Sequence, residues 1–168
     1  MIPKTKQVTF SIPGWVSVTL EPNEVERQAA WKLYVELATR VGSQPFDRST
    51  GSLRAVLDSL YSVFGLTRTI LKEAGPDVAS SDTSFGPLAI RFLTEVLAPF
   101  LLEWHEPLLE YESQRKPEVS KIEYERQWKR YSQMCDGFDE LRPKIQGYVS
   151  ALADIAGVSH VANPRSLL

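Results

Sequence analysis

The side chains with the most potential for chemistry are concentrated in residues 103–112, where the run Glu-Trp-His-Glu is followed by two further glutamates. Carboxylates and imidazoles bind divalent metals and act as general acids or bases. A dimetal site in a helical bundle needs Glu-x-x-His pairs on two helices. Here the residue three before His105 is Leu102, and the second histidine, His160, is far along the chain. We therefore expect no metal site and no cofactor, and we interpret this segment as an acidic helix end.

Cys135, the single cysteine, is a candidate nucleophile. It lies between Tyr131 and Phe138 with the spacing of a helix seam, where a buried thiol is usually inert. The sequence has no Gly-x-Ser-x-Gly elbow, phosphate-binding loop or dinucleotide fingerprint. We therefore assign no catalytic residue and expect a non-enzymatic protein, with an enzyme built around His105 as an open alternative.

Residues 121–131 combine cations with aromatic rings, a composition typical of surfaces that bind phosphates and stack bases. The rings, however, fall on the expected buried side of a helix, whereas stacking requires exposed rings. Glu123 and Glu125 also reduce the local positive charge. We expect a solvated helix face and no nucleic-acid binding. The cations are Arg126, Lys129 and Arg130, and the rings are Tyr124, Trp128 and Tyr131.

The elements that would position these residues begin with a β-hairpin over residues 8–20. Apolar residues alternate with serine and threonine on both sides of Pro13-Gly14, which is the period of a strand. Proline followed by glycine at the centre favours a type II turn. Because an isolated hairpin is marginal in water, we expect its apolar face to pack on helices.

Four long helices are expected to follow the hairpin. The second ends at Gly75-Pro76, with the glycine as a left-handed cap, and the fourth ends at Gly157. Pro87 opens the third helix, and a capping box at Ser120 opens the fourth. The first helix is apolar around most of its circumference, which favours burial on several sides or contact with a partner. The predicted helices cover residues 22–41, 52–74, 87–112 and 121–156.

Together these elements predict one all-α domain over residues 1–168, a long-helix up-down four-helix bundle with a short N-terminal β-hairpin. The fourth helix carries a coiled-coil seam that is interrupted beside Pro143. Pro99 and Pro107 should each bend the third helix, because each removes a backbone donor. Residues 158–168 are expected to form a loosely held tail.

The composition fits a globular protein of the cytoplasm. The 19 Lys+Arg and 21 Asp+Glu residues give a net charge of -2, which provides no overall attraction to nucleic acid or to an anionic membrane. The single cysteine fits a reducing compartment, and the N-terminus lacks the apolar stretch of a signal peptide. Residues 88–104 are the most apolar segment but contain charges and a proline, so we interpret them as a core helix and expect no membrane association.

One resemblance rests on residues 88–105, which read LAIRFLTEVLAPFLLEWH. This segment resembles part of uncharacterised bacterial all-helical proteins associated with conflict or antiphage operons. It covers about a tenth of the chain and contains no catalytic motif, so it implies a biological context and no site residues.

Three hypotheses for function follow, in order of preference. The first is a non-enzymatic interaction module, an adaptor or accessory subunit that binds another protein or its own copy. The second is a small-molecule or nucleotide sensor with a pocket between helices. The third is an enzyme of unfamiliar design around His105. The residues proposed to line a ligand pocket are Trp31, Tyr34, Trp104, His105, Trp128 and Tyr131.

Overall fold

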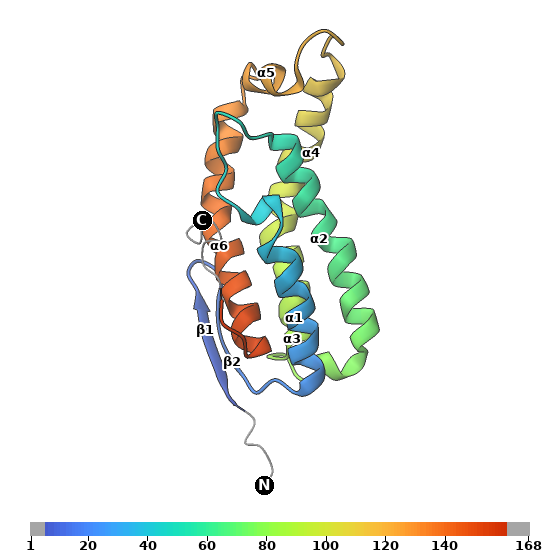
Figure 1. Cartoon of the computed structure of the whole chain (residues 1–168), viewed down its shortest axis with the longest axis vertical. Helices are drawn as coiled ribbons and strands as arrows, with labels where there is room; N and C mark the ends of the chain where they lie inside the picture. The colour runs from blue at the N-terminus through green and yellow to red at the C-terminus, as the bar shows by residue number, and fades with distance from the viewer. Residues whose placement is uncertain (1–5, 161–168) are drawn as a thin grey trace.

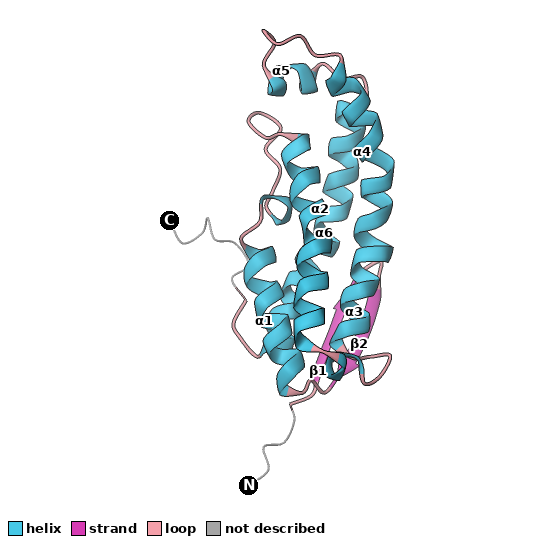
Figure 2. Ribbon diagram, turned by 90° about the vertical axis from the view of Figure 1, so that its right-hand side faces the viewer, coloured by secondary structure: helices cyan, strands magenta, loops and turns pink. Residues whose placement is uncertain are grey.

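The computed structural model describes residues 6–160, and the protein is mostly helical with one two-stranded antiparallel hairpin. The long helices lie side by side along the longest axis, and the hairpin lies against α6 (Figures 1 and 2). The short helix α5 lies across one end (Figure 1). In chain order the elements are β1 (Val8–Ile12), β2 (Val16–Leu20), α1 (Glu24–Ala38), η1 (Val41–Ser43), α2 (Leu53–Ala74), η2 (Pro76–Ala79), α3 (Phe85–Arg91), η3 (Phe92–Leu97), α4 (Ala98–Ser113), α5 (Lys121–Arg126) and α6 (Tyr131–Ala156).

The predicted hairpin is confirmed. Its strands pair antiparallel from Val8 opposite Leu20 to Ile12 opposite Val16, so three residues form the connection. The Trp15 N–H donates to the Ile12 carbonyl at 3.0 Å, and Gly14 has a φ of +77°, as a type II turn requires. The apolar side chains of β1 are buried, and the hairpin packs on α6 as expected.

Helix α1 is shorter than the predicted span of residues 22–41. Asn23 forms a complete capping box with Glu26, which fixes the first turn at Glu24. The helix ends at Ala38 because the following segment packs on α2 instead of continuing. There the Gly42 N–H donates to the Ser59 hydroxyl at 3.0 Å.

Helix α2 begins and ends within one residue of the prediction. The Ser52 hydroxyl accepts the Ala55 N–H at 3.2 Å and caps its start. The prediction of a left-handed cap at Gly75 is wrong, because Gly75 combines a φ of 80° with an extended ψ of -173°. The positive φ still favours glycine, and the extended ψ directs the chain into η2.

The third predicted helix, residues 87–112, is observed as one continuous helical segment from Phe85 to Ser113. Within it, η3 is a π-helix, and the Ala98 N–H donates to the Leu93 carbonyl five residues earlier. Pro99 explains this widening, because it has no N–H for the Glu95 carbonyl and its ring crowds that carbonyl. The expected disturbance at Pro99 therefore takes the form of a π-helical insertion, and Pro107 is accommodated inside α4.

The prediction of one continuous helix over residues 121–156 is wrong. Helix α5 ends at Arg126, and α6 begins at Tyr131 after a turn in which the Tyr131 N–H donates to the Trp128 carbonyl at 3.0 Å. The chain turns because α5 carries Glu125 into the N-terminus of α2, a position that a straight helix would not reach. The Ser120 hydroxyl does accept the Glu123 N–H at 3.4 Å, as the predicted helix start requires.

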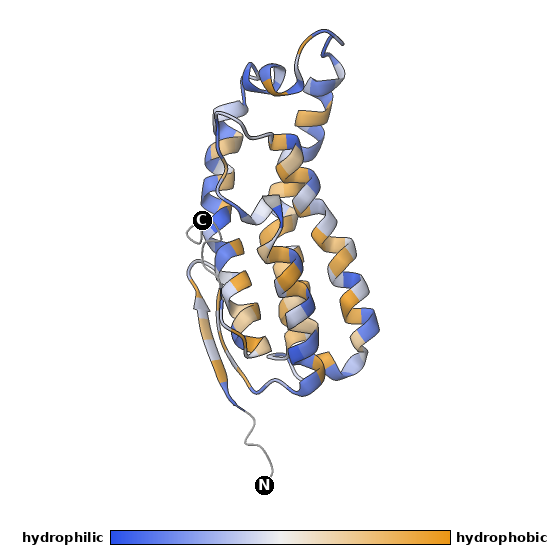
Figure 3. Cartoon of the chain, in the orientation of Figure 1, coloured by the Kyte–Doolittle hydropathy of each residue, from blue (hydrophilic) through white to orange (hydrophobic). Residues whose placement is uncertain are grey.

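The core runs the length of α6. The predicted seam is buried within α6 from Cys135 and Phe138 to Leu152 and Ile155, and the helix is not interrupted at Pro143. The first three residues of the predicted seam, Tyr124, Trp128 and Tyr131, are only half-buried. Hydrophobic residues line α1, α4 and α6 along their lengths (Figure 3). The predicted tail, residues 158–168, is described only to His160, so most of it lies outside the described residues.

The segment Phe85–Ser113 is long and apolar enough to cross a membrane by length and composition. Within its most apolar window, 56% of the residues are buried in the protein. Core helices of globular proteins satisfy the same criterion of length and composition.

Candidate functional site

The structure brings together two of the predicted pocket residues, Trp104 and Trp128. Their ring centroids are 6.1 Å apart in an edge-on arrangement, and the Arg130 guanidinium lies 4.4 Å from the Trp104 ring centroid. Tyr111 stacks on Trp128 at 5.7 Å. Trp104 itself is only 2% exposed. This cluster joins α4 to the turn between α5 and α6, and the cation stacked on a buried ring stabilises that junction.

The other predicted pocket residues lie elsewhere. Trp31 and Tyr34 stack on each other along α1 at 5.9 Å, and Tyr34 also contacts the His160 ring. The Tyr131 hydroxyl donates to the Arg48 carbonyl at 3.2 Å, beside the buried Cys135. Within residues 6–160 no ring contact joins the Trp31 pair to Trp104, so the structure divides the proposed lining into separate places.

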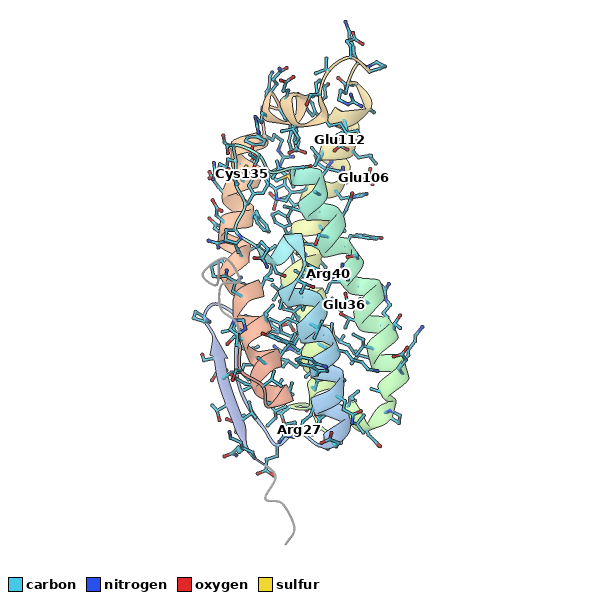
Figure 4. The ribbon with its side chains drawn as sticks, viewed as in Figure 1. Arg27, Glu36, Arg40, Glu106, Glu112 and Cys135 are labelled. Atoms are coloured by element: carbon cyan, nitrogen blue, oxygen red, sulfur yellow. The ribbon has the colours of Figure 1, made fainter. Side chains whose placement is uncertain are left out.

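His105 lies against α2. Its ring stacks on Tyr61 at 6.0 Å, and its Nδ1 is 3.5 Å from Nη1 of Arg54. Arg54 is in turn held by both carboxylate oxygens of Glu112, at 2.8 to 3.1 Å. Figure 4 shows Glu112 and Glu106 on the same part of α4. In the described part of the chain no group of three or more histidine, cysteine or acidic side chains could hold a metal ion.

Cys135 is buried among the core residues of α6 (Figure 4), as the seam predicts. Burial raises the pKa of its thiol, although Tyr131 and Arg48 act in the opposite direction. A protonated and buried thiol is a poor nucleophile, so the structure supports a packing role.

A buried glutamate positions the end of the molecule at which α5 lies. Glu125 is 4% exposed, and its carboxylate accepts the Leu53 N–H at 2.6 Å and the Arg54 N–H at 3.1 Å. These are first-turn donors of α2, which have no partner within their own helix. Glu125 therefore caps α2 from α5 and fixes Arg54 next to His105. No local sequence pattern signals this contact, because it joins residues more than seventy positions apart.

A shallow groove with a mostly apolar lining lies between α2 and α4, and we call it the apolar groove. Its volume is about 410 Å³. Tyr61 and Leu102 border it and are 64% and 81% exposed, large values for apolar side chains. Gly65 and Ala98 are the small residues of its lining, and a Cβ atom placed on Gly65 would meet nothing within 4 Å. The lining consists of Tyr61, Ser62, Phe64, Gly65, Arg68, Ala98, Leu101 and Leu102.

The sequence patterns did not predict this groove. They predicted excess apolar surface on the first helix, where Trp31 and Val35 are 47% and 40% exposed. The signal for the groove was Leu102, an apolar residue that is exposed next to charged Glu103, whereas its neighbours Leu101 and Trp104 are buried. Its partner across the groove, Tyr61, comes from α2 and has no such signal.

Comparison with known proteins assigns the chain to no family, because no protein-family model, curated protein or solved structure matches it.

Proposed function

We propose that this protein is a non-enzymatic interaction module, an accessory subunit that pairs with a second copy of itself through the apolar groove. The observation that carries the proposal is the exposure of Tyr61 and Leu102 on either side of that groove. Large exposed apolar side chains that form one patch mark interaction surfaces, whereas scattered ones need no explanation.

The shape of the groove suits a helix. Ridges formed by Tyr61 and Leu102 flank small residues at Gly65 and Ala98, and helices pack by inserting ridges into such grooves. The proposal includes an up-down bundle formed by α1, α2, the segment from α3 to α4, and α6. In such a bundle, α2 and α4 of two copies would form a further four-helix layer.

The charges at the two ends of the groove favour a second copy as the occupant. One end carries Arg68, with Lys72 one turn further along α2, and neither has an ion pair among residues 6–160. At the other end lie Asp58 and Glu106, whose side chains are 66% and 82% exposed. Asp58 is 3.6 Å from the Arg54 guanidinium, and Glu106 is 4.0 Å from the His105 ring. A two-fold axis through the middle of the groove would place the basic end of each copy against the acidic end of the other.

The resemblance of residues 88–105 to proteins of bacterial conflict or antiphage operons gives this proposal a context. An accessory subunit of such a system would act by assembly, which agrees with the exposed apolar groove and the buried Cys135.

The test introduces a charge at the edge of the groove. Leu102→Arg should convert a dimer into a monomer, because a guanidinium would lie in an apolar contact. Val158→Arg, which changes another exposed apolar residue away from the groove, is the matched control. Light scattering during size-exclusion chromatography over a concentration series gives the masses. A monomeric parent at every concentration, or equal dimerisation of Leu102→Arg, would reject the proposal.

A further inference from the structure

A second groove lies on another side of α4, between η3, α4 and α6, and we call it the acidic groove. Its volume is about 430 Å³, and it shares no lining residue with the apolar groove. Phe100 and Trp104 contribute aromatic rings to it, and Gly137 contributes a position without a side chain. A volume in this range accepts a few ligand side chains.

The rim of the acidic groove carries more negative than positive charge. Glu95, Glu103, Asp136 and Glu140 line it, against one lysine, Lys144. Two of these carboxylates are engaged, since Glu95 binds Arg91 and the Trp15 indole, and Asp136 binds Arg48. Glu103 on α4 and Glu140 on α6 have no ion pair in the described part of the chain and face the groove from its two walls. The groove therefore presents two available carboxylates to a cation.

A side-chain donor without a protein acceptor opens into the same groove. Trp104 is 2% exposed, and its indole N–H has no hydrogen-bond acceptor among residues 6–160. Trp104 Nε1 lies next to Gly137, because a Cβ atom on Gly137 would be 3.6 Å from it, and both residues line the groove. A ligand carbonyl in the groove would supply the missing acceptor.

Gly137 keeps that donor accessible. It lies in the interior of α6, where glycine is less favourable than alanine, and a Cβ atom there would find ordinary contacts at 3.5 Å or more. Packing within the chain therefore does not require glycine at this position. A methyl group would cover the Trp104 N–H from the groove side.

We propose that the acidic groove binds an extended, arginine- or lysine-bearing segment of a partner protein. The cationic head group binds between Glu103 and Glu140, its methylene groups lie on Phe100, and a backbone carbonyl of the segment accepts the Trp104 N–H. Charge selects the segment and the indole donor fixes its position along the groove. This site is independent of the proposed pairing through the apolar groove.

The first experiment measures binding of the acetylated, amidated peptide Gly-Arg-Leu-Arg-Leu-Arg-Gly by calorimetry. The double variant Glu103→Gln, Glu140→Gln should weaken binding about tenfold, because two charge-assisted contacts are lost. The double variant Glu110→Gln, Glu118→Gln removes the same charge from exposed positions outside both grooves and should bind as the parent does. A peptide with citrulline in place of arginine should not bind. No binding by the parent, or equal effects of the two double variants, would overturn the proposal.

The second experiment follows the Trp104 indole N–H in a ¹⁵N-labelled sample, assigned with Trp104→Phe. The peptide should shift this resonance downfield, whereas spermine, which has cations but no carbonyl, should leave it in place. Gly137→Ala should stabilise the protein and weaken peptide binding at least several-fold, a combination that damage to the fold cannot produce. A Trp104 resonance unmoved by bound peptide, or undiminished binding by Gly137→Ala, would contradict the assignment of the carbonyl site.

Discussion

Glu125 is the residue that most shapes the upper end of the molecule. Its carboxylate replaces the missing acceptors of the first turn of α2 and lies near the ion pair of Arg54 with Glu112. Glu26 has the same role at the opposite end, where it accepts the Asn23 N–H and the Phe85 N–H, both at 2.8 Å. In each case a buried acid on one helix satisfies the N-terminus of another helix, which fixes how the two helices meet.

Replacing Glu125 with alanine should lower the free energy of unfolding by about 1 to 3 kcal/mol, because two buried backbone donors lose their acceptor. Urea denaturation followed by circular dichroism measures the change. Glu118→Ala, which removes an exposed carboxylate outside the helices, is the control and should change stability by less than about 0.5 kcal/mol. Equal effects of the two substitutions would contradict the capping role.

The same carboxylate predicts a pH dependence. Burial raises the pKa of Glu125 and nearby Glu112 adds to the effect, although the Leu53 and Arg54 N–H groups act in the opposite direction. A pKa that is higher in the folded than in the unfolded chain means that the folded state binds the proton more readily. The stability that this group contributes is therefore greatest below its unfolded pKa and decreases as the pH rises through its folded pKa.

The measurement compares the parent with Glu125→Gln in urea at several pH values between about 4 and 7, a range that includes the ordinary pKa of glutamate. The stability of the parent relative to the variant should fall as the pH increases. A relative stability that rises with pH would show that the backbone donors outweigh burial.

At the scale of elements, several ends follow from local signals, whereas the break between α5 and α6 does not. The hairpin follows from the alternation of apolar residues, and the ends of α2 follow from Ser52 and Gly75. Each of these signals lies within or next to the element that it sets. The break between α5 and α6 depends on Glu125 reaching a distant helix, which no local pattern reveals. The prolines at 99 and 107 predicted disturbance, and the structure has a π-helix before Pro99 and an uninterrupted α4 at Pro107.

The contact between the hairpin and α6 gives a further prediction. A Cβ atom on Gly147 would lie 3.0 Å from Ile12 Cγ2, so Gly147→Ala should force β1 away and destabilise the protein by about 1 kcal/mol or more. Gly137→Ala in the same helix meets no close atom and should stabilise it by about 0.5 to 1 kcal/mol. Thermal unfolding distinguishes the two. Stabilisation by both substitutions would show that the hairpin yields without cost.

At the scale of the whole molecule, the mostly helical fold with its hairpin was predicted from sequence, whereas the surfaces that could bind a partner were not. Periodicity identifies which side of a helix is apolar, but a groove depends on which helices become neighbours. Tyr61 meets Leu102 across the apolar groove, and Glu103 faces Glu140 across the acidic groove, only because α4 packs between α2 and α6. The ligand pocket proposed from the sequence grouped aromatic residues that lie in separate parts of the structure.

The central claim is that two copies pair about a two-fold axis through the apolar groove, and charge reversal at its ends tests this most directly. Sedimentation velocity gives the dimer dissociation constant of the parent, of Arg68→Glu, of Glu106→Lys and of the double variant. Each single reversal should weaken the dimer several-fold, by about 1 kcal/mol for the two symmetry-related contacts. The double variant should recover the parent's affinity, because each copy then carries the reversed pair. Failure of the double variant to recover affinity, or a parent that stays monomeric, would contradict the account.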